Sequence, residues 1–224
     1  MGKAGWMDIR VTDDPADAAA AWIARRLRDG VRRRGTAALA LSGGGAAASL
    51  IAGLIAADLA WNSIGVWQVD ERIAPDGHDA RNANQLSDLP CRVHLMPVTA
   101  SDLRASARRY AASLPERFDV VHLGLGDDGH TASWPPGDSA TLNSKRPVEL
   151  VDLFNGWCRM TLTRSVVNGA RSRVLLIVGG SKRPVVERWL LGDTSLPATS
   201  VSRSRTIAFL DGDAAPSVRL HRTD

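Results

Sequence analysis

Cysteine is rare in this sequence, and long apolar segments are absent from it. The two cysteines, Cys91 and Cys158, lie far apart in the chain, which excludes a disulfide framework and a cysteine-rich metal site. No run of about 18 apolar residues is present, and the beginning of the chain lacks the apolar segment of a signal peptide. We therefore expect a soluble, cytoplasmic protein that has no membrane partner.

Lysine is also scarce, although the chain is basic. It occurs only as Lys3, Lys145 and Lys182, so most of the 28 basic residues are arginine, and the net charge is +4. A positive balance suits an anionic substrate. No helix-turn-helix pattern and no segment of interleaved basic and aromatic residues is present, so we expect no nucleic-acid partner.

The chain has the length and composition of an α/β domain, with 224 residues, 44% of them hydrophobic. Short apolar runs predict strands, and they alternate with longer segments that predict helices. We expect strands at 8–11, 36–41, 64–69, 92–96, 118–125, 159–163, 173–178 and 205–210, and helices at 16–34, 46–60, 101–114 and 182–191.

Strands that alternate with helices predict a mostly parallel sheet with helices on both faces, the doubly wound α/β arrangement. Residues 138–156 fit no element. Because no repeat and no linker divides the chain, we expect a single domain over residues 1–224.

The most informative stretch is 118–137. An apolar run predicts a buried strand, and three glycines then end it. Asp127, Asp128 and His130 lie in this glycine-rich turn. In open α/β sheets, ligands bind at the carboxyl ends of the strands, so the turn would present His130 to a ligand. The alternative is a loop histidine beside a capping aspartate.

A second glycine-rich turn lies between an expected strand and an expected helix. It reads Ser42-Gly-Gly-Gly45, which is neither a P-loop nor a dinucleotide-binding fingerprint. Glycines at the beginning of a helix let backbone N–H groups approach an anion. We expect Ser42, Gly43, Gly44 and Gly45 to bind a phosphate group, and a tight turn without a ligand is the alternative.

Charged side chains lie at the ends of three other expected strands. Asp70 and Arg72 end one strand, where they form either a surface ion pair or an arginine fork over an oxyanion or phosphate. Lys182 is placed at the beginning of a helix, where the helix dipole disfavours a cation unless an anion binds there too. Arg159 is a further candidate cation.

Taken in order, these motifs resemble those of a known family. They are Leu41-Ser-Gly-Gly, Val69-Asp-Glu-Arg, Asp79 to Asn82, Gly124-Leu-Gly-Asp-Asp-Gly-His-Thr-Ala-Ser133, Arg159-Met-Thr-Leu-Thr and Leu196-Pro-Ala198. Between about residues 8 and 215 the chain is similar to the glucosamine-6-phosphate isomerase/6-phosphogluconolactonase family, with the histidine segment as the most specific part. The resemblance to its lactonases implies hydrolysis of 6-phosphoglucono-1,5-lactone to 6-phosphogluconate in the pentose phosphate pathway, without a cofactor.

The chain departs from the family pattern at three places. Gly45 and Ala46 replace a hydroxyl residue and a proline, which leaves the phosphate turn with fewer hydroxyl donors. Pro135 replaces a phenylalanine, and the segment before Arg159 lacks its usual proline. The role of Arg159 therefore stays open at this point.

Lactone hydrolysis requires an activated water, a partner for the oxyanion and a proton for the departing ring oxygen. His130 is the candidate general base, and Asp128 or Asp70 would hold its imidazole in one tautomer. Arg72 or N–H groups of the turn would stabilise the oxyanion. No G-x-S-x-G motif is present, which disfavours a serine nucleophile.

Two alternative functions remain. The first is an isomerase or deaminase of the same fold, but Pro135 stands where deaminases of the family carry a catalytic glutamate. The second is a non-catalytic sugar-phosphate-binding module, which would have no need of His130. We expect no metal, because the other histidines lack ligand spacing: they are His78, His94, His122 and His221. We also expect a monomer.

Overall fold

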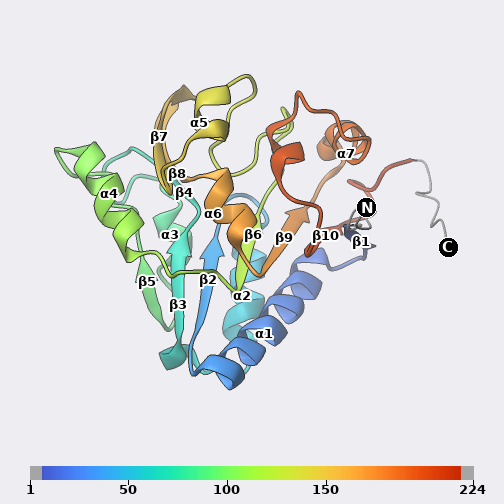
Figure 1. Ribbon diagram of the computed structural model, residues 1–224. Coiled ribbons are helices and arrows are strands. Elements are labelled where there is room, and N and C mark those ends of the chain that lie inside the picture. Colours follow the sequence, from blue (N-terminus) through green and yellow to red (C-terminus); the bar gives the residue numbers. More distant parts are fainter. Residues whose placement is uncertain (1–6, 218–224) are drawn as a thin grey trace, which may run out of the picture.

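Seven parallel strands form the centre of the molecule (Figure 1). The computed structural model describes residues 7–217. The strand order is β1-β10-β9-β6-β2-β3-β5, and every neighbouring pair is parallel. The strands are β1 (Asp8–Val11), β2 (Ala37–Leu41), β3 (Ile64–Gln68), β5 (Arg92–His94), β6 (Val120–Leu123), β9 (Ser172–Ile177) and β10 (Thr206–Leu210). The mostly parallel sheet predicted from the sequence is confirmed.

Helices cover both faces of this sheet, also as predicted. One face packs against α1 (Pro15–Arg34), α2 (Ala47–Ala56) and α3 (Ala83–Leu86), and the other against α4 (Leu103–Ser113), α6 (Arg164–Gly169) and α7 (Arg183–Leu190). Successive side chains of a strand point to opposite faces, so Val120 and Val121 of β6 belong to two different hydrophobic clusters. No helix of the described segment is long and apolar enough to cross a membrane.

The order of the strands reverses between β2 and β6. From β2 the chain continues outward through β3 and β5, whereas β6, β9 and β10 extend the sheet on the other side of β2. The loops that follow β2 and β6 therefore leave the sheet in opposite directions and open a crevice at its carboxyl edge. This switch point is where doubly wound sheets bind ligands.

A second, antiparallel sheet lies above that edge in the view of Figure 1. It contains β4 (Asp70–Arg72), β8 (Trp157–Leu162) and β7 (Val148–Phe154), in the order β4-β8-β7. The prediction that 138–156 fits no element was wrong, since α5 (Ser139–Asn143) and β7 occupy it. Asn155 and Gly156 both have positive φ angles between β7 and β8, and this Asn-Gly pair is a strong hairpin signal.

Helix α2 is shorter than the predicted 46–60. It ends at Ala56, and the chain then turns so that Leu59 is buried in the cluster beneath α1 and α2. Arg28 of α1 holds this turn by donating a hydrogen bond to the carbonyl of Asp58 at 2.8 Å. Packing has overridden helix propensity here.

One buried carboxylate connects β4 to the loop that follows it. Glu71 is fully buried and lies 3.1 Å from the guanidinium of Arg81, which is also buried. Its oxygens accept hydrogen bonds, each of 2.8 Å, from the Gln68 side chain and from the backbone N–H groups of Arg72, Asn82 and Ala83. Glu71 therefore fixes the path of the chain between β4 and α3.

We predict that Glu71→Gln destabilises the fold by about 3 kcal/mol or more, because it removes the buried carboxylate that pairs with Arg81 and leaves the exposed Asp76 as the remaining carboxylate partner of that buried guanidinium. The glutamine side chain also puts an NH₂ donor in place of one Glu71 oxygen, which leaves backbone N–H groups facing another donor. Urea unfolding measures the effect. Glu116→Gln, at an exposed position, is the matched control and should change stability by less than about 0.5 kcal/mol. Equal stabilities of the two variants would contradict the role of Glu71.

Candidate active site

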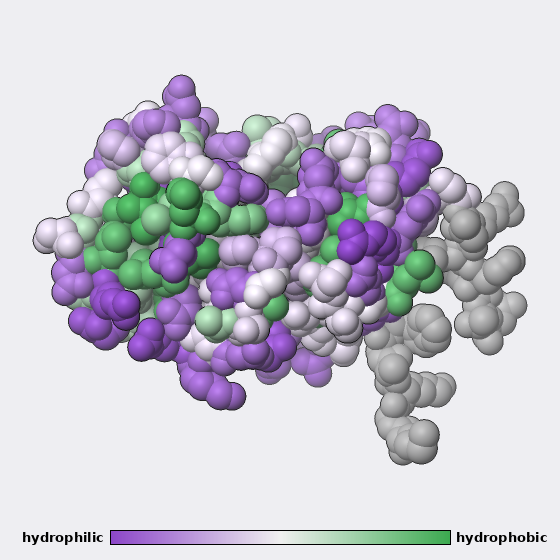
Figure 2. Space-filling view, turned by 90° about the horizontal axis from the view of Figure 1, so that it is seen from above, coloured by the Kyte–Doolittle hydropathy of each residue, from purple (hydrophilic) through white to green (hydrophobic). Residues whose placement is uncertain are grey.

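A cavity of about 850 Å³ opens at the switch point between β2 and β6. Every site residue predicted from the sequence lines it, with the exception of Asp128. Figure 2 looks down on this edge of the molecule, where apolar residues gather toward one side and more polar residues occupy the middle. The fold thus brings together side chains from four separate motifs.

A tight turn after β6 presents His130 to the cavity. The Gly126 carbonyl accepts a hydrogen bond from the Gly129 N–H at 2.9 Å, and the Gly126 N–H donates to the His130 carbonyl at 2.8 Å. Gly129 has a φ of +86°, a conformation that glycine adopts without strain. Asp128 Oδ1 accepts from the His130 N–H at 3.1 Å and lies 2.5 Å from His130 Nδ1. The turn therefore pairs the carboxylate with the imidazole.

This pairing determines the tautomer of the imidazole. Partial burial acts to raise the pKa of Asp128, but the hydrogen bonds from His130 outweigh it, so the pKa of Asp128 lies below its usual value. An ionised Asp128 accepts a proton-bearing Nδ1, which leaves Nε2 of His130 as the free basic nitrogen. This is the arrangement of a histidine that acts as a general base.

Gly126 makes room for the ring. A Cβ atom at this position would overlap the His130 imidazole and approach Asp128 Oδ1 to 2.7 Å. By contrast, a Cβ atom on Gly124 would meet nothing within 4 Å. Gly126 is therefore required to leave space for the His130 ring, whereas Gly124 is not.

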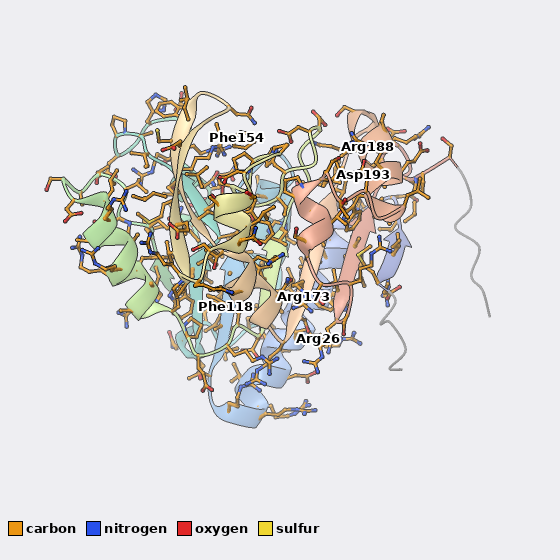
Figure 3. The ribbon with its side chains drawn as sticks, turned by 45° about the horizontal axis from the view of Figure 1, so that its top comes forward. Arg26, Phe118, Phe154, Arg173, Arg188 and Asp193 are labelled. Carbon is orange, nitrogen blue, oxygen red and sulfur yellow. The ribbon has the colours of Figure 1, made fainter. Side chains whose placement is uncertain are left out.

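The second sheet covers the imidazole. Phe154 at the end of β7 packs edge-on against His130, with 5.1 Å between the ring centroids, and the guanidinium of Arg159 lies 5.0 Å from the same phenyl ring. Figure 3 shows Phe154 at the upper end of this sheet. Phe154 was not among the predicted site residues, and recognising the Asn155-Gly156 hairpin would have placed it beside β8.

Asp70 lies deeper in the cavity wall and contacts different groups. Its Oδ2 accepts a hydrogen bond of 2.6 Å from Ser133 Oγ, which lies 3.4 Å from Arg159 Nη1. Burial raises the pKa of Asp70, although Ser133 and the nearby arginines act in the opposite sense. Of the two carboxylates considered as partners of His130, Asp128 makes the contact, and Asp70 is paired with Ser133.

Arg72 and Arg159 face each other across β4 and β8, where they are register partners. Arg72 donates to the carbonyl of Ala80 at 3.2 Å and to the side chain of Asn82. Burial lowers the pKa of Arg159, and the neighbouring charge of Arg72 lowers it further. Two guanidinium groups held this close favour an anion between or beside them.

Lys182 reaches the cavity from the end of β9. It closes a short 3₁₀ turn, η2 (Gly180–Lys182), and α7 begins one residue later, so Lys182 precedes the helix in which it was predicted to lie. Its Nζ lies 2.9 Å from Asp127 Oδ1, and Ser181 Oγ donates to the same oxygen at 3.2 Å. The hydrogen bond from Lys182 lowers the pKa of Asp127. The two motifs that follow β6 and β9 are thus joined by an ion pair.

The Ser42–Gly45 turn borders the same cavity at the beginning of α2. Ser42 Oγ donates to the carbonyl of His122 at 3.1 Å, and the Gly44 N–H donates to Gln85 Oε1 at 3.1 Å. The N–H groups of Gly43 and Gly45 have no partner among residues 7–217. Helix α2 carries no acidic residue in its first turn, so these N–H groups remain suited to an anion.

Comparison with known proteins agrees with this geometry. The sequence model of a family described as glucosamine-6-phosphate isomerases/6-phosphogluconolactonase matches residues 11–209. This chain belongs to that family. The resemblance inferred from the motifs is therefore confirmed over nearly the whole length of the chain.

Individual members of the family are similar in sequence and in structure. A 6-phosphogluconolactonase of Streptomyces coelicolor is 32% identical, over 89% of this chain and 89% of its own. The crystal structure of a 6-phosphogluconolactonase of Thermotoga maritima has a TM-score of 0.83 at 25% identity and covers 91% of this chain and 99% of its own. A monomeric glucosamine-6-phosphate deaminase, at 20% identity, shares the fold with a TM-score of 0.82 over 93% of this chain and 98% of its own.

We predict that Gly126→Ala displaces the His130 ring without unfolding the protein, since the added methyl group needs the volume that the ring occupies. The crystal structure of the variant should show the contact between His130 Nδ1 and Asp128 Oδ1 broken. Gly124→Ala is the matched control and should keep the contact. An intact contact in Gly126→Ala would show that the turn adapts and that Gly126 does not position the ring.

Proposed function

We propose that this chain hydrolyses 6-phosphoglucono-1,5-lactone to 6-phosphogluconate in the pentose phosphate pathway, with His130 as the general base. The observation that carries the proposal is that His130, paired with Asp128, lies at the wall of a cavity that is also lined by a glycine turn suited to an anion and by several cations. The relatives named 6-phosphogluconolactonase support the same reaction.

The substrate would bind through its phosphate group at one end of the cavity. The unpaired N–H groups of Gly43 and Gly45 lie just before α2, where a helix favours an anion, and Lys182 lines the same cavity. Lys182 would exchange its ion pair with Asp127 for the phosphate, and Arg159 is a second candidate partner of that group. This binding holds the lactone carbonyl near His130.

The chemical step uses His130 twice. Nε2 takes a proton from water, and the resulting hydroxide adds to the lactone carbonyl carbon to give a tetrahedral oxyanion. As this intermediate collapses, the bond between the carbonyl carbon and the ring oxygen breaks, and the imidazolium returns its proton to that oxygen. Asp128 keeps Nδ1 protonated throughout and stabilises the imidazolium, as the carboxylate of a catalytic triad does.

The developing negative charge requires a partner that is already in place. Arg72 is the candidate, because Asn82 and the Ala80 carbonyl hold its guanidinium at the cavity wall. A preorganised donor to an oxyanion contributes about 3 kcal/mol to catalysis. Asp70 would balance the positive charge of Arg72 and Arg159 without touching the imidazole.

The alternative deaminase reaction has less support. Similarity to a solved deaminase extends to the fold alone, and Pro135 has no ionisable group to replace the glutamate expected in deaminases of the family. The proposed reaction needs only water and groups of this chain, so it requires neither a cofactor nor a residue from a second copy. Cys91 and Cys158 are both unpaired, as suits the reducing cytoplasm.

His130→Asn is expected to lower kcat by about 10²–10⁴-fold, the usual contribution of a positioned general base. Lactone hydrolysis should be followed at several enzyme concentrations, so that the spontaneous reaction can be subtracted. The exposed His78, which does not line the cavity, provides the control His78→Asn with unchanged kcat. A folded His130→Asn enzyme with wild-type kcat would exclude His130 as the base.

Lys182→Ala is expected to raise KM about tenfold or more and to lower kcat less, because phosphate is bound in both the ground state and the transition state. Lys145→Ala, at an exposed position away from the cavity, should leave both constants unchanged. Measurement with the unphosphorylated lactone provides a second control, because Lys182→Ala should affect that substrate little. An unchanged KM for the phosphorylated lactone would remove Lys182 from the phosphate site.

A further inference from the structure

A second histidine borders the cavity, and neither the chemistry above nor the sequence motifs assign it a function. His122 lies in the middle of β6, and its side chain shares the α1 and α2 face of the sheet with Val120, two residues earlier. Only 2% of its surface is exposed, and its partner on β9 is the apolar Val174. An imidazole therefore occupies a place where the neighbouring strand residues are apolar.

The ring of His122 has no hydrogen-bond partner within residues 7–217. Nδ1 is buried and unpaired. Nε2 is also without a partner there but is not enclosed, and since the ring borders the cavity, Nε2 opens onto it. A buried polar group without a partner costs free energy that folding alone does not recover. Such a cost at a cavity wall points to a ligand.

The state of the ring makes it a hydrogen-bond donor toward the cavity. Burial lowers the pKa of His122 to about 4, so the imidazole is neutral near pH 7 and carries one N–H proton. A proton on Nδ1 would be a buried donor without an acceptor, and orphaned buried N–H groups are rarer than under-satisfied acceptors. The proton therefore belongs on Nε2, which faces the cavity.

The glycine turn next to His122 has few side-chain donors for a phosphate group. Ser42 directs its hydroxyl proton to the backbone carbonyl of His122, and Gly45 has no side chain. The Gly44 N–H is already bonded to Gln85. A phosphate monoester has several lone pairs to satisfy, so a site that depends on Gly43 and Gly45 N–H groups leaves some of them without a donor from the turn.

We propose that Nε2–H of His122 donates a hydrogen bond to the phosphate group of the bound lactone and so replaces the hydroxyl donor that this glycine turn lacks. The proposal rests on the proposed function for the identity of the substrate, but the ligand chemistry is that of any phosphate monoester dianion. Asp14 and Asp17 also border the cavity, where they are exposed at the beginning of α1. Because the imidazole of His122 is neutral, it can donate to the phosphate group without adding a positive charge to the cavity that Lys182 also lines.

The kinetic test compares His122→Leu with His122→Gln. Leucine fits the apolar strand neighbours but removes the donor, so KM for the phosphorylated lactone should rise by about ten- to a hundredfold while kcat is kept. Glutamine can reach the cavity with an N–H donor and should recover most of the affinity. With the unphosphorylated lactone, His122→Leu should behave like the wild type.

A direct binding measurement separates this proposal from the proposed function. Calorimetry with 6-phosphogluconate should show weaker binding to His122→Leu and unchanged binding to His78→Leu, whether or not the protein hydrolyses the lactone. In the wild type, saturation with 6-phosphogluconate should shift the ¹⁵N resonance of His122 Nε2, a readout that requires no variant to fold. Wild-type affinity of folded His122→Leu, or a resonance that does not move, overturns the proposal.

Discussion

The charge balance of the cavity wall is the constraint on which the rest of the site depends. Asp70 lies at the wall with Arg72 and Arg159, whose charges act to lower its pKa against the effect of burial, and Asp127 pairs with Lys182. Behind the wall, Glu71 pairs with Arg81. Cations buried without such partners would lose protons or displace the strands that carry them. The carboxylates therefore hold the cations in place before a substrate arrives, which is the condition for electrostatic catalysis.

Two sheets with different hydrogen-bonding patterns contribute different kinds of groups to this site. The parallel sheet ends in glycine-rich turns and supplies backbone N–H groups and His130, whereas the antiparallel sheet supplies side chains. Register matters most in the antiparallel sheet, where Arg72 lies opposite Arg159. A slip by one residue would turn one of the two guanidinium groups to the opposite face. Glu71, which lies between Asp70 and Arg72, fixes β4 and so keeps Arg72 opposite Arg159.

The sequence was most informative where a structural feature is local. The apolar run of β6 and the turn through Gly129 predict that Asp128 and His130 can meet, because the two residues are separated by one position. The contact between Phe154 and His130 depends on the pairing of distant segments, which periodicity cannot reveal. Strand β7 alternates buried and exposed residues weakly, so only its Asn-Gly turn marked it. His122 was considered only as a metal ligand, since a strand pattern does not show which side chain within a strand borders a cavity.

Strain at the site is held by the core beneath it. Ala132, two residues after His130, has a φ of +50°, a conformation that costs a residue other than glycine about 1–3 kcal/mol. The residues on either side resist relaxation: Thr131 Oγ1 donates to the Gly124 carbonyl at 2.8 Å, and Trp134, which is fully buried, donates from Nε1 to the Leu162 carbonyl at 2.8 Å. Because Trp134 belongs to the hydrophobic core and Leu162 to β8, the segment that follows His130 is held by the core and by the second sheet as well as by its own turn.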